Sequence, residues 1–148
     1  MIIFVEVSLK EIFKLKEKFP WPRPKKCPKC NAFRVWKHGF VSANFDGFTS
    51  SLVIRRFRCP NCGGVIRMRP AGYFSRFQAS IPTIRSSIKN KLCRFKWLGN
   101  ISRTRQRHWY NALKRRVKAW FGDSAQKDMM AAFDFIVLKG LTPVSRSL

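Results

Sequence analysis

Two Cys-x-x-Cys pairs constrain this chain more than any other feature. The first pair is Cys27 and Cys30 in "CPKC", and the second is Cys59 and Cys62 in "CPNCGG". A Cys-x-x-Cys turn supplies two thiolates from one chain reversal, so two such turns complete a tetrahedral zinc shell. A thioredoxin-like redox site needs only one pair within a βαβ unit, whereas these two pairs flank β-rich sequence. We therefore expect one structural Zn²⁺ held by all four cysteines.

Two other side chains could compete for the metal. Cys93 lies in an apolar helical stretch, so we expect a buried free thiol there and not a fifth ligand. His38 follows Cys30 by eight residues along a predicted strand, so we expect it to pack or to face a phosphate. Four cysteines leave no open coordination position, so the metal should fold a small sheet and not activate water.

Turn residues and periodicity predict an α+β fold with strands first and helices later. Ser8 and Glu11 have the spacing of a capping box, which predicts a helix after the short strand "IIFVEV" with Leu9, Ile12, Phe13 and Phe19 close to one face. The runs "FRVWKHGF", "SLVIRRFRC" and "VIRMR" have β-rich composition and predict a small antiparallel zinc-ribbon sheet. The expected segments are an N-terminal βα unit (1–19), a proline-rich linker (20–26), the zinc ribbon (27–75), a helical helix-turn-helix module (80–140) and a tail (141–148).

Three helices are expected in the second half. Ser80 can cap a helix that carries Ile84, Ile88 and Leu92 at helical spacing. Ser102 can cap a helix over 103–121 that stops at Gly122, with Trp109, Leu113, Val117 and Trp120 on its core side. Asp123 or Ser124 can cap a last helix that ends at Gly140, with an apolar stripe of Met129, Ala132, Phe133 and Ile136.

The charge of the chain points to a polyanionic partner. Lys and Arg number 31 against 7 Asp and Glu, a formal net charge of +24, and no acidic residue occurs from Gly47 to Gly122. A single-sign field of that extent repels itself unless phosphates neutralise it, which favours nucleic acid. The basic residues are spread through the folded region and no stretch suits a signal peptide or a membrane span, so we expect no membrane partner and a cytoplasmic, nucleoid-associated protein.

The 103–121 helix has the best pattern for contacting bases. Its polar side fits the second helix of a helix-turn-helix, because Arg can bond to guanine, Asn to adenine and Lys to phosphates. The residues expected to contact nucleic acid there are Arg103, Arg105, Arg107, Tyr110, Asn111, Lys114 and Lys118. In the ribbon, a basic platform that contacts phosphates or an adjacent groove is expected from Arg55, Arg56, Arg58, Lys37 and His38.

The run "CPKC...VWKHGF...IRRFRCPNCGG...RP", followed by "ISRTRQRHWYNAL", resembles the zinc-ribbon and helix-turn-helix regions of bacterial insertion-sequence transposases and their small relatives. The resemblance covers roughly residues 25–121 and implies recognition of transposon-end DNA. Such a transposase also needs three dispersed carboxylates that hold two metal ions. After the basic region this sequence has only Asp123, Asp128 and Asp134, within one short predicted helix.

We therefore expect a DNA-binding accessory protein, regulator or end-binding subunit of a mobile element, without its own catalytic domain and not an enzyme. A transposase or recombinase, or a second copy of the chain, is the protein partner that this interpretation allows. The alternative is a structural RNA-binding component of a ribosome-like or RNA-guided particle. In that case unpaired bases could stack on Phe33, Trp36, Phe40, Phe57 and Tyr73, although strand alternation would place several of these in the core.

Overall fold

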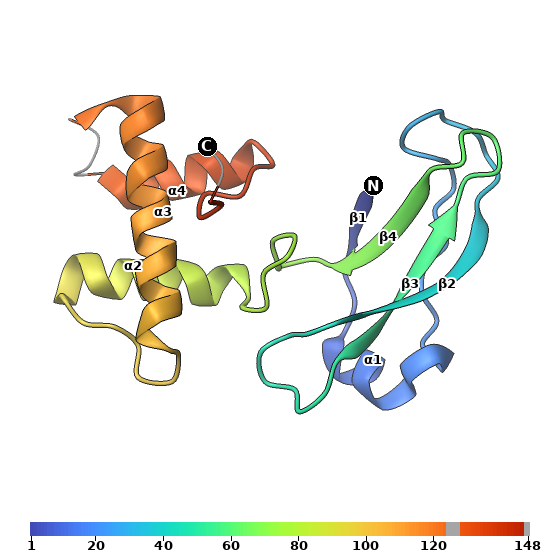
Figure 1. Ribbon diagram of the computed structural model, residues 1–148, viewed down its shortest axis with the longest axis horizontal. Coiled ribbons are helices and arrows are strands. Elements are labelled where there is room, and N and C mark those ends of the chain that lie inside the picture. Colours follow the sequence, from blue (N-terminus) through green and yellow to red (C-terminus); the bar gives the residue numbers. More distant parts are fainter. Residues whose placement is uncertain (124–127, 147–148) are drawn as a thin grey trace. The chain divides into compact units, whose positions relative to one another are not determined.

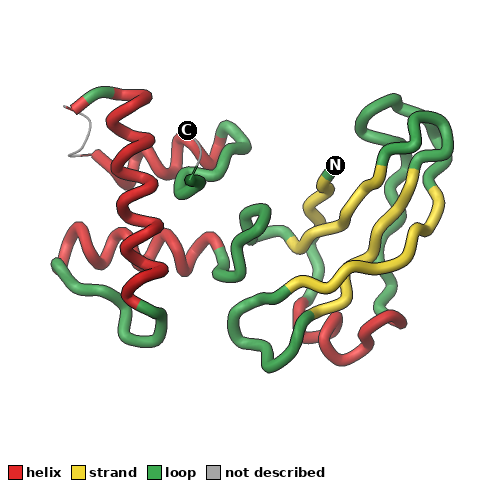
Figure 2. Tube along the Cα trace, in the orientation of Figure 1, coloured by secondary structure: helices red, strands yellow, loops and turns green. Residues whose placement is uncertain are grey.

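The structure, a computed structural model, describes residues 1–123 and 128–146. It divides the chain into two compact units, unit 1 (Met1–Ala79) and unit 2 (Ser80–Leu148). The elements are β1 (Ile2–Val5), α1 (Leu9–Leu15), the 3-10 helix η1 (Lys16–Lys18), β2 (Trp36–Ala43), β3 (Leu52–Arg58), β4 (Val65–Pro70), α2 (Ile81–Arg94), α3 (Arg103–Phe121) and α4 (Met129–Leu138). Among the described residues, unit 1 contains the strands and α1, and unit 2 contains α2, α3 and α4, so the fold class is α+β (Figures 1 and 2).

The strands of unit 1 form one sheet in the order β1-β4-β3-β2. The strand β3 pairs antiparallel with β2 and with β4, as the β-rich runs predict. We expected residues 1–19 to form a separate βα unit, but β1 pairs parallel with β4 and becomes an edge strand of the same sheet. The pairing begins at the first residue, since the Arg67 N–H donates to the Met1 carbonyl over 2.9 Å.

The N-terminal helix is shorter than its pattern predicts. Ser8 caps α1 as expected, because its hydroxyl accepts from the Glu11 N–H at 3.4 Å. Lys16 then adopts a φ of 53° and ends α1, and the chain continues as η1. Ile12 is fully buried in the core, whereas Phe13, which we expected close to the same helical face, is exposed and contacts Phe48 with ring centroids 5.4 Å apart.

One hydrophobic core lies between β3, β4 and the helical segment of unit 1. Both α1 and η1 contact β3. The largest buried side chains of the sheet are Leu52, Ile54, Phe57, Ile66 and Met68, each at most 2% exposed. Cys27 and Cys59 belong to the same buried cluster, so the cysteine turns are continuous with the core.

The helices of unit 2 contact one another in all three pairs, and α3 runs across α2 (Figure 1). The hydroxyls of Ser80 and Ser102 cap α2 and α3, as predicted, by accepting from N–H groups three residues on. The bounds of α3 agree with the prediction. Trp120, however, is 42% exposed and not part of the core. The helix α4 begins at Met129, with Asp128 and not Asp123 at its N-cap position, and the Asp128 side chain makes no cap hydrogen bond; Ser124 lies outside the described residues.

A buried glutamine fixes the connection between α2 and α3. Gln106 is fully buried, and its Oε1 accepts from the Ser87 hydroxyl at 2.7 Å and from the Leu98 N–H at 2.9 Å. Its Nε2 donates to the carbonyls of Leu98 and Ile101 at 2.8 and 2.9 Å. One side chain of α3 thus bonds to α2 and to two positions of the loop, which orients α3 relative to α2.

Candidate metal centre and nucleic-acid interface

The two cysteine turns have the same backbone structure. In the first, the Cys27 N–H donates to the Ala32 carbonyl at 2.8 Å and the Asn31 N–H donates back to the Cys27 carbonyl at 2.9 Å. In the second, Cys59 and Gly63 make the equivalent bonds, both at 2.9 Å. The residue after the second cysteine is left-handed in each turn, with φ of 60° at Asn31 and 70° at Gly63. Asparagine and glycine tolerate that conformation best.

These turns bring four sulfurs together from distant parts of unit 1. The Sγ atoms of Cys27, Cys30, Cys59 and Cys62 all lie within 4.8 Å of one another. Across the two turns, Cys27 and Cys62 are 3.7 Å apart and Cys30 and Cys59 are 3.5 Å apart. A tetrahedral ion with bonds of about 2.3 Å to sulfur requires sulfur-to-sulfur distances of about 3.8 Å. The cluster therefore fits one structural metal ion.

The ionisation of the cluster also suits a cation. The Asn61 side chain and the Ala32 N–H stabilise the thiolate of Cys30 and lower its pKa to about 6. At Cys62 the Gly64 N–H favours the thiolate, but burial and the three other sulfurs oppose it and raise the pKa to about 11. Four adjacent thiolates cannot all be charged by themselves, whereas a bound divalent cation stabilises every one of them.

The two rival ligands lie outside this cluster. Among the described residues, the four cysteines are the only group of three or more Cys, His, Asp or Glu side chains placed to hold a metal ion. His38 lies instead where the β2–β3 register shifts, between Lys37 and Phe40. Cys93 is exposed and not buried as we expected, because the last turn of α2 presents it away from the apolar side that carries Ile84 and Ile88.

The polar side of α3 is exposed along the length of the helix. Its buried side contains Trp109, Leu113 and Val117, as predicted. Lys118 lies 3.6 Å from the Asp123 carboxylate in an exposed ion pair. The predicted contact residues that are exposed on α3 are Arg103, Arg107, Asn111, Lys114 and Lys118.

Two predicted contact residues of α3 are only half-exposed. The guanidinium of Arg105 lies 5.2 Å from the ring centroid of Trp109. Tyr110 packs edge-to-face against Trp97, with centroids 6.0 Å apart. Tyr110 thus contacts the loop before α3, whereas Arg105 stacks within α3 itself, and both are less exposed than Arg107 and Asn111.

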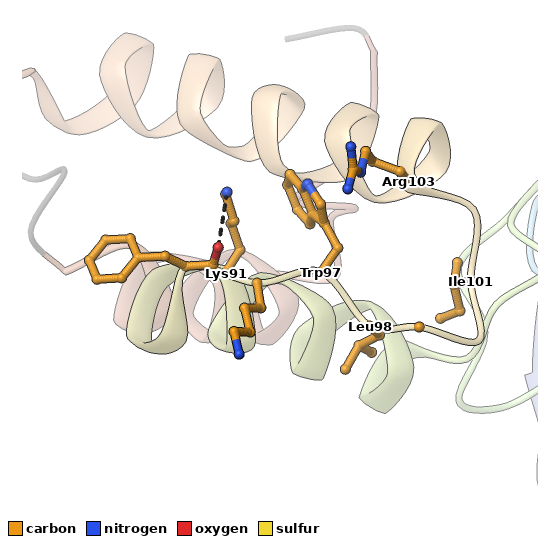
Figure 3. A pocket seen from close by; sticks show the side chains of 8 residues that line it. Lys91, Trp97, Leu98, Ile101 and Arg103 are labelled. Carbon is orange, nitrogen blue, oxygen red and sulfur yellow. Dashed lines mark hydrogen bonds between the residues drawn. The ribbon is translucent and has the colours of Figure 1, made fainter.

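An open basic pocket of about 630 Å³ lies where α2 leads into α3. Lys91, Lys96 and Arg103 line it together with Trp97. In Figure 3 Lys91 and Arg103 flank the Trp97 ring, and the Lys91 ammonium lies 4.8 Å from that ring's centroid. The Gln106 hydrogen bonds set the loop that forms one wall of this pocket.

The basic residues of the ribbon do not all form one patch. The half-buried Arg55 stacks over the ring of Phe40, its cross-strand partner, at 4.3 Å from the ring centroid. Arg56 and Arg58 follow on β3, where Arg56 pairs with Arg67 and Arg58 pairs with Trp36 and Val65. Lys37 is exposed and His38 is half-buried.

Several residues of these surfaces were missed by sequence reasoning. Lys91, Lys96 and Trp97 fall at a helix end and in a loop, so no periodic pattern marks them. Arg67 sits in a short strand, and its position opposite Arg56 depends on the β3–β4 register. The exposed aromatic Phe33 was expected inside a strand, but β2 begins only at Trp36.

Asp134, a carboxylate near the C-terminus, is paired with an arginine. Asp134 accepts two hydrogen bonds from Arg85 of α2, at 2.8 and 2.9 Å, and this pairing lowers the pKa of Asp134.

Within residues 1–123 and 128–146, no helix is long and apolar enough to cross a membrane. Comparisons with protein-family models, curated proteins and solved structures find no match to this chain.

Proposed function

We propose that the protein binds duplex DNA, with the exposed side of α3 in the major groove in the manner of a helix-turn-helix. The observation that carries this proposal is the pair Arg107 and Asn111, which lie one turn apart on α3 and are both exposed. The opposite side of α3 is anchored by Trp109, Leu113 and Val117. A recognition helix needs this division, because its base-reading side chains must be free while its backbone is held in place.

The side chains of α3 and its surroundings suit separate roles at a duplex. Arg107 can make two hydrogen bonds to guanine, and Asn111 can make two to adenine. Lys91, Lys96 and Arg103, around the pocket before α3, supply positive charge for the phosphates that flank the groove. Phosphate contacts set the position of the protein, and base contacts then select the sequence.

The metal in this proposal is zinc, and its role is to fold unit 1. Four thiolates select a soft or borderline ion and leave no position for water or substrate. The resemblance to the front region of insertion-sequence transposases suggests the biological setting, which is an accessory, regulatory or end-binding role at a mobile element. A transposase or recombinase would then be the protein partner.

The test is a specificity ratio, the affinity for a selected duplex site divided by that for random duplex DNA at one fixed salt concentration. Arg107→Ala and Asn111→Ala should each weaken the selected site by about 1 to 3 kcal/mol and change random DNA little. Lys114→Ala should weaken both alike, since lysine grips phosphate. Equal losses on both DNAs for all three variants would refute base reading by α3.

A structural RNA-binding role is the second candidate, and exposed aromatic side chains favour it. Phe33 and Trp36 are 84% and 57% exposed, which leaves their rings accessible to unpaired bases. Phe57 is buried, and Phe40 lies under Arg55. Direct competition between duplex DNA and structured RNA for the zinc-loaded protein distinguishes the two candidates.

A further inference from the structure

Two large aromatic side chains are exposed beside the cysteine cluster. Phe33 is 84% exposed and Trp36 is 57% exposed. Together with Asn31 and Asn61 they line an open hollow of about 520 Å³ that reaches the Cys30 turn. An exposed aromatic ring costs free energy in water, so two of them that line one hollow suggest a ligand that stacks.

Arginines continue this surface across the sheet. Trp36 is the cross-strand partner of Arg58, and Arg56, two positions earlier on β3, is the partner of Arg67. Side chains two apart on a strand share a face, and paired residues lie next to each other on it. Trp36, Arg58, Arg56 and Arg67 are therefore neighbours on one face of the sheet.

The Arg56–Arg67 pair is unfavourable for the free protein. Like charges directly opposite each other on neighbouring strands destabilise a sheet. The buried Nε of Arg56 has no hydrogen-bond partner, and the sequence has no acidic residue from Gly47 to Gly122. Arg69, the next arginine on this face of β4, differs because it donates to the carbonyls of Phe74 and Phe77 and so has a structural role.

We propose that this surface, the ribbon face (Phe33, Trp36, Arg56, Arg58 and Arg67), binds single-stranded DNA. Unpaired bases stack on Phe33 and Trp36, and the backbone phosphates lie over the three arginines. Stacking tolerates every base because every base has a π-face, whereas a paired duplex offers no free base face to these rings. The site goes beyond the duplex binding proposed for α3, and it suits unpaired nucleotides such as those at an opened or processed DNA end.

The test measures the affinity of the zinc-loaded full chain for single-stranded oligothymidylate and for a blunt-ended DNA duplex without unpaired loops. Phe33→Ala and Trp36→Ala should each weaken single-strand binding about 5- to 100-fold and leave duplex binding within about twofold. Phe135→Ala is the matched control, because Phe135 is a 43% exposed aromatic side chain on α4 of unit 2 and lies outside both proposed DNA surfaces. Unchanged single-strand affinity in both ribbon variants would overturn the proposal.

A charge-matched pair tests the arginines. Arg67→Gln and Lys14→Gln each remove one positive charge from unit 1, but only Arg67 lies on the ribbon face. Arg67→Gln should reduce the slope of log K against log salt on single strands by about 0.7, whereas Lys14→Gln should leave that slope unchanged. Arg67→Gln should also raise the midpoint of thermal unfolding of the DNA-free protein, because the change relieves the repulsion with Arg56.

The outcomes separate this inference from the duplex proposal. Loss of single-strand binding in ribbon variants supports the ribbon face even if the wild-type protein binds no duplex selectively. An equal reduction of the single-strand salt slope in Arg67→Gln and Lys14→Gln, with no gain in the thermal stability of Arg67→Gln, would overturn the arginine assignment. Tighter binding of oligouridylate than of oligothymidylate, with the same dependence on Phe33 and Trp36, would overturn the choice of DNA in favour of RNA.

Discussion

The two units of this protein keep their structure by different means. Unit 1 joins strands and turns from distant parts of the sequence, and its cysteine cluster ties residues 27–30 to residues 59–62. In the described part of unit 2, the helices α2, α3 and α4 bury one another's apolar sides around Leu113, Phe133 and Ile136. Its cysteine, Cys93, is exposed and takes no part in its core.

The same contrast applies to the polar groups inside the units. In unit 1 four buried or half-buried thiols need a cation before all can be charged. In unit 2 the buried amide of Gln106 is satisfied entirely by Ser87, Leu98 and Ile101. We infer that the order of unit 1 depends on a ligand, whereas the buried amide of Gln106 finds its partners within unit 2.

Removal of the metal should have the largest effect and should separate the units. Cys59→Ser, or a chelator, should release the metal and unfold unit 1, because metal binding of this kind contributes about 10 to 16 kcal/mol to small zinc domains. The helical circular dichroism of unit 2 should persist. Metal analysis and circular dichroism on the same sample measure both.

Cys93→Ser is the matched control for this experiment. It exchanges the same atoms at an exposed position outside the cluster, so the metal content should stay at one ion per chain. A Cys59→Ser protein that keeps its full metal content would contradict the four-cysteine site. Joint loss of both units would contradict their independence.

Gln106→Leu should destabilise unit 2 and leave the metal in unit 1. The change deprives the Ser87 hydroxyl and three backbone groups of their partners, and each unsatisfied buried group costs about 1 to 3 kcal/mol. We expect a loss of about 3 kcal/mol or more in the free energy of unfolding, measured by urea with helical circular dichroism. Gln78→Leu, at an exposed position of unit 1, should change it by less than about 0.5 kcal/mol.

The smallest expected effect concerns the ion pair between α2 and α4. Arg85 lowers the pKa of Asp134, so the pair stabilises unit 2 above the unfolded pKa of about 3.9 and loses this contribution as the pH falls through the folded value. The side chains are 39% and 49% exposed, which limits the coupling to about 1 kcal/mol. A double-mutant cycle of Arg85→Gln and Asp134→Asn at pH 7 and pH 3 measures it. Equal coupling at both pH values would rule out the charge pair.

Local patterns in the sequence determined much of this architecture. The Cys-x-x-Cys spacing predicted which four cysteines meet, because each turn is made by residues that are adjacent in the chain. Serine caps predicted where α1, α2 and α3 begin, because the hydroxyl bonds to an N–H only three residues on. The apolar stripe with Phe133 and Ile136 likewise predicted the buried side of α4.

Other features were decided only by tertiary structure. Parallel pairing of β1 with β4 joins segments more than 60 residues apart, so no local pattern signals it. The neighbours Arg56 and Arg67 meet through the register of two strands, and the partners of Gln106 come from another helix and a loop.

The position of Trp120 shows the same limit. Helical periodicity places a side chain on one side of a helix, but burial also requires a neighbouring element at that point along the axis. Trp120 comes near the C-terminal end of α3 and remains exposed, although periodicity places it on the core side. The sequence thus determined the elements and the metal ligands, whereas the contacts between elements decided which side chains were left free to meet a partner.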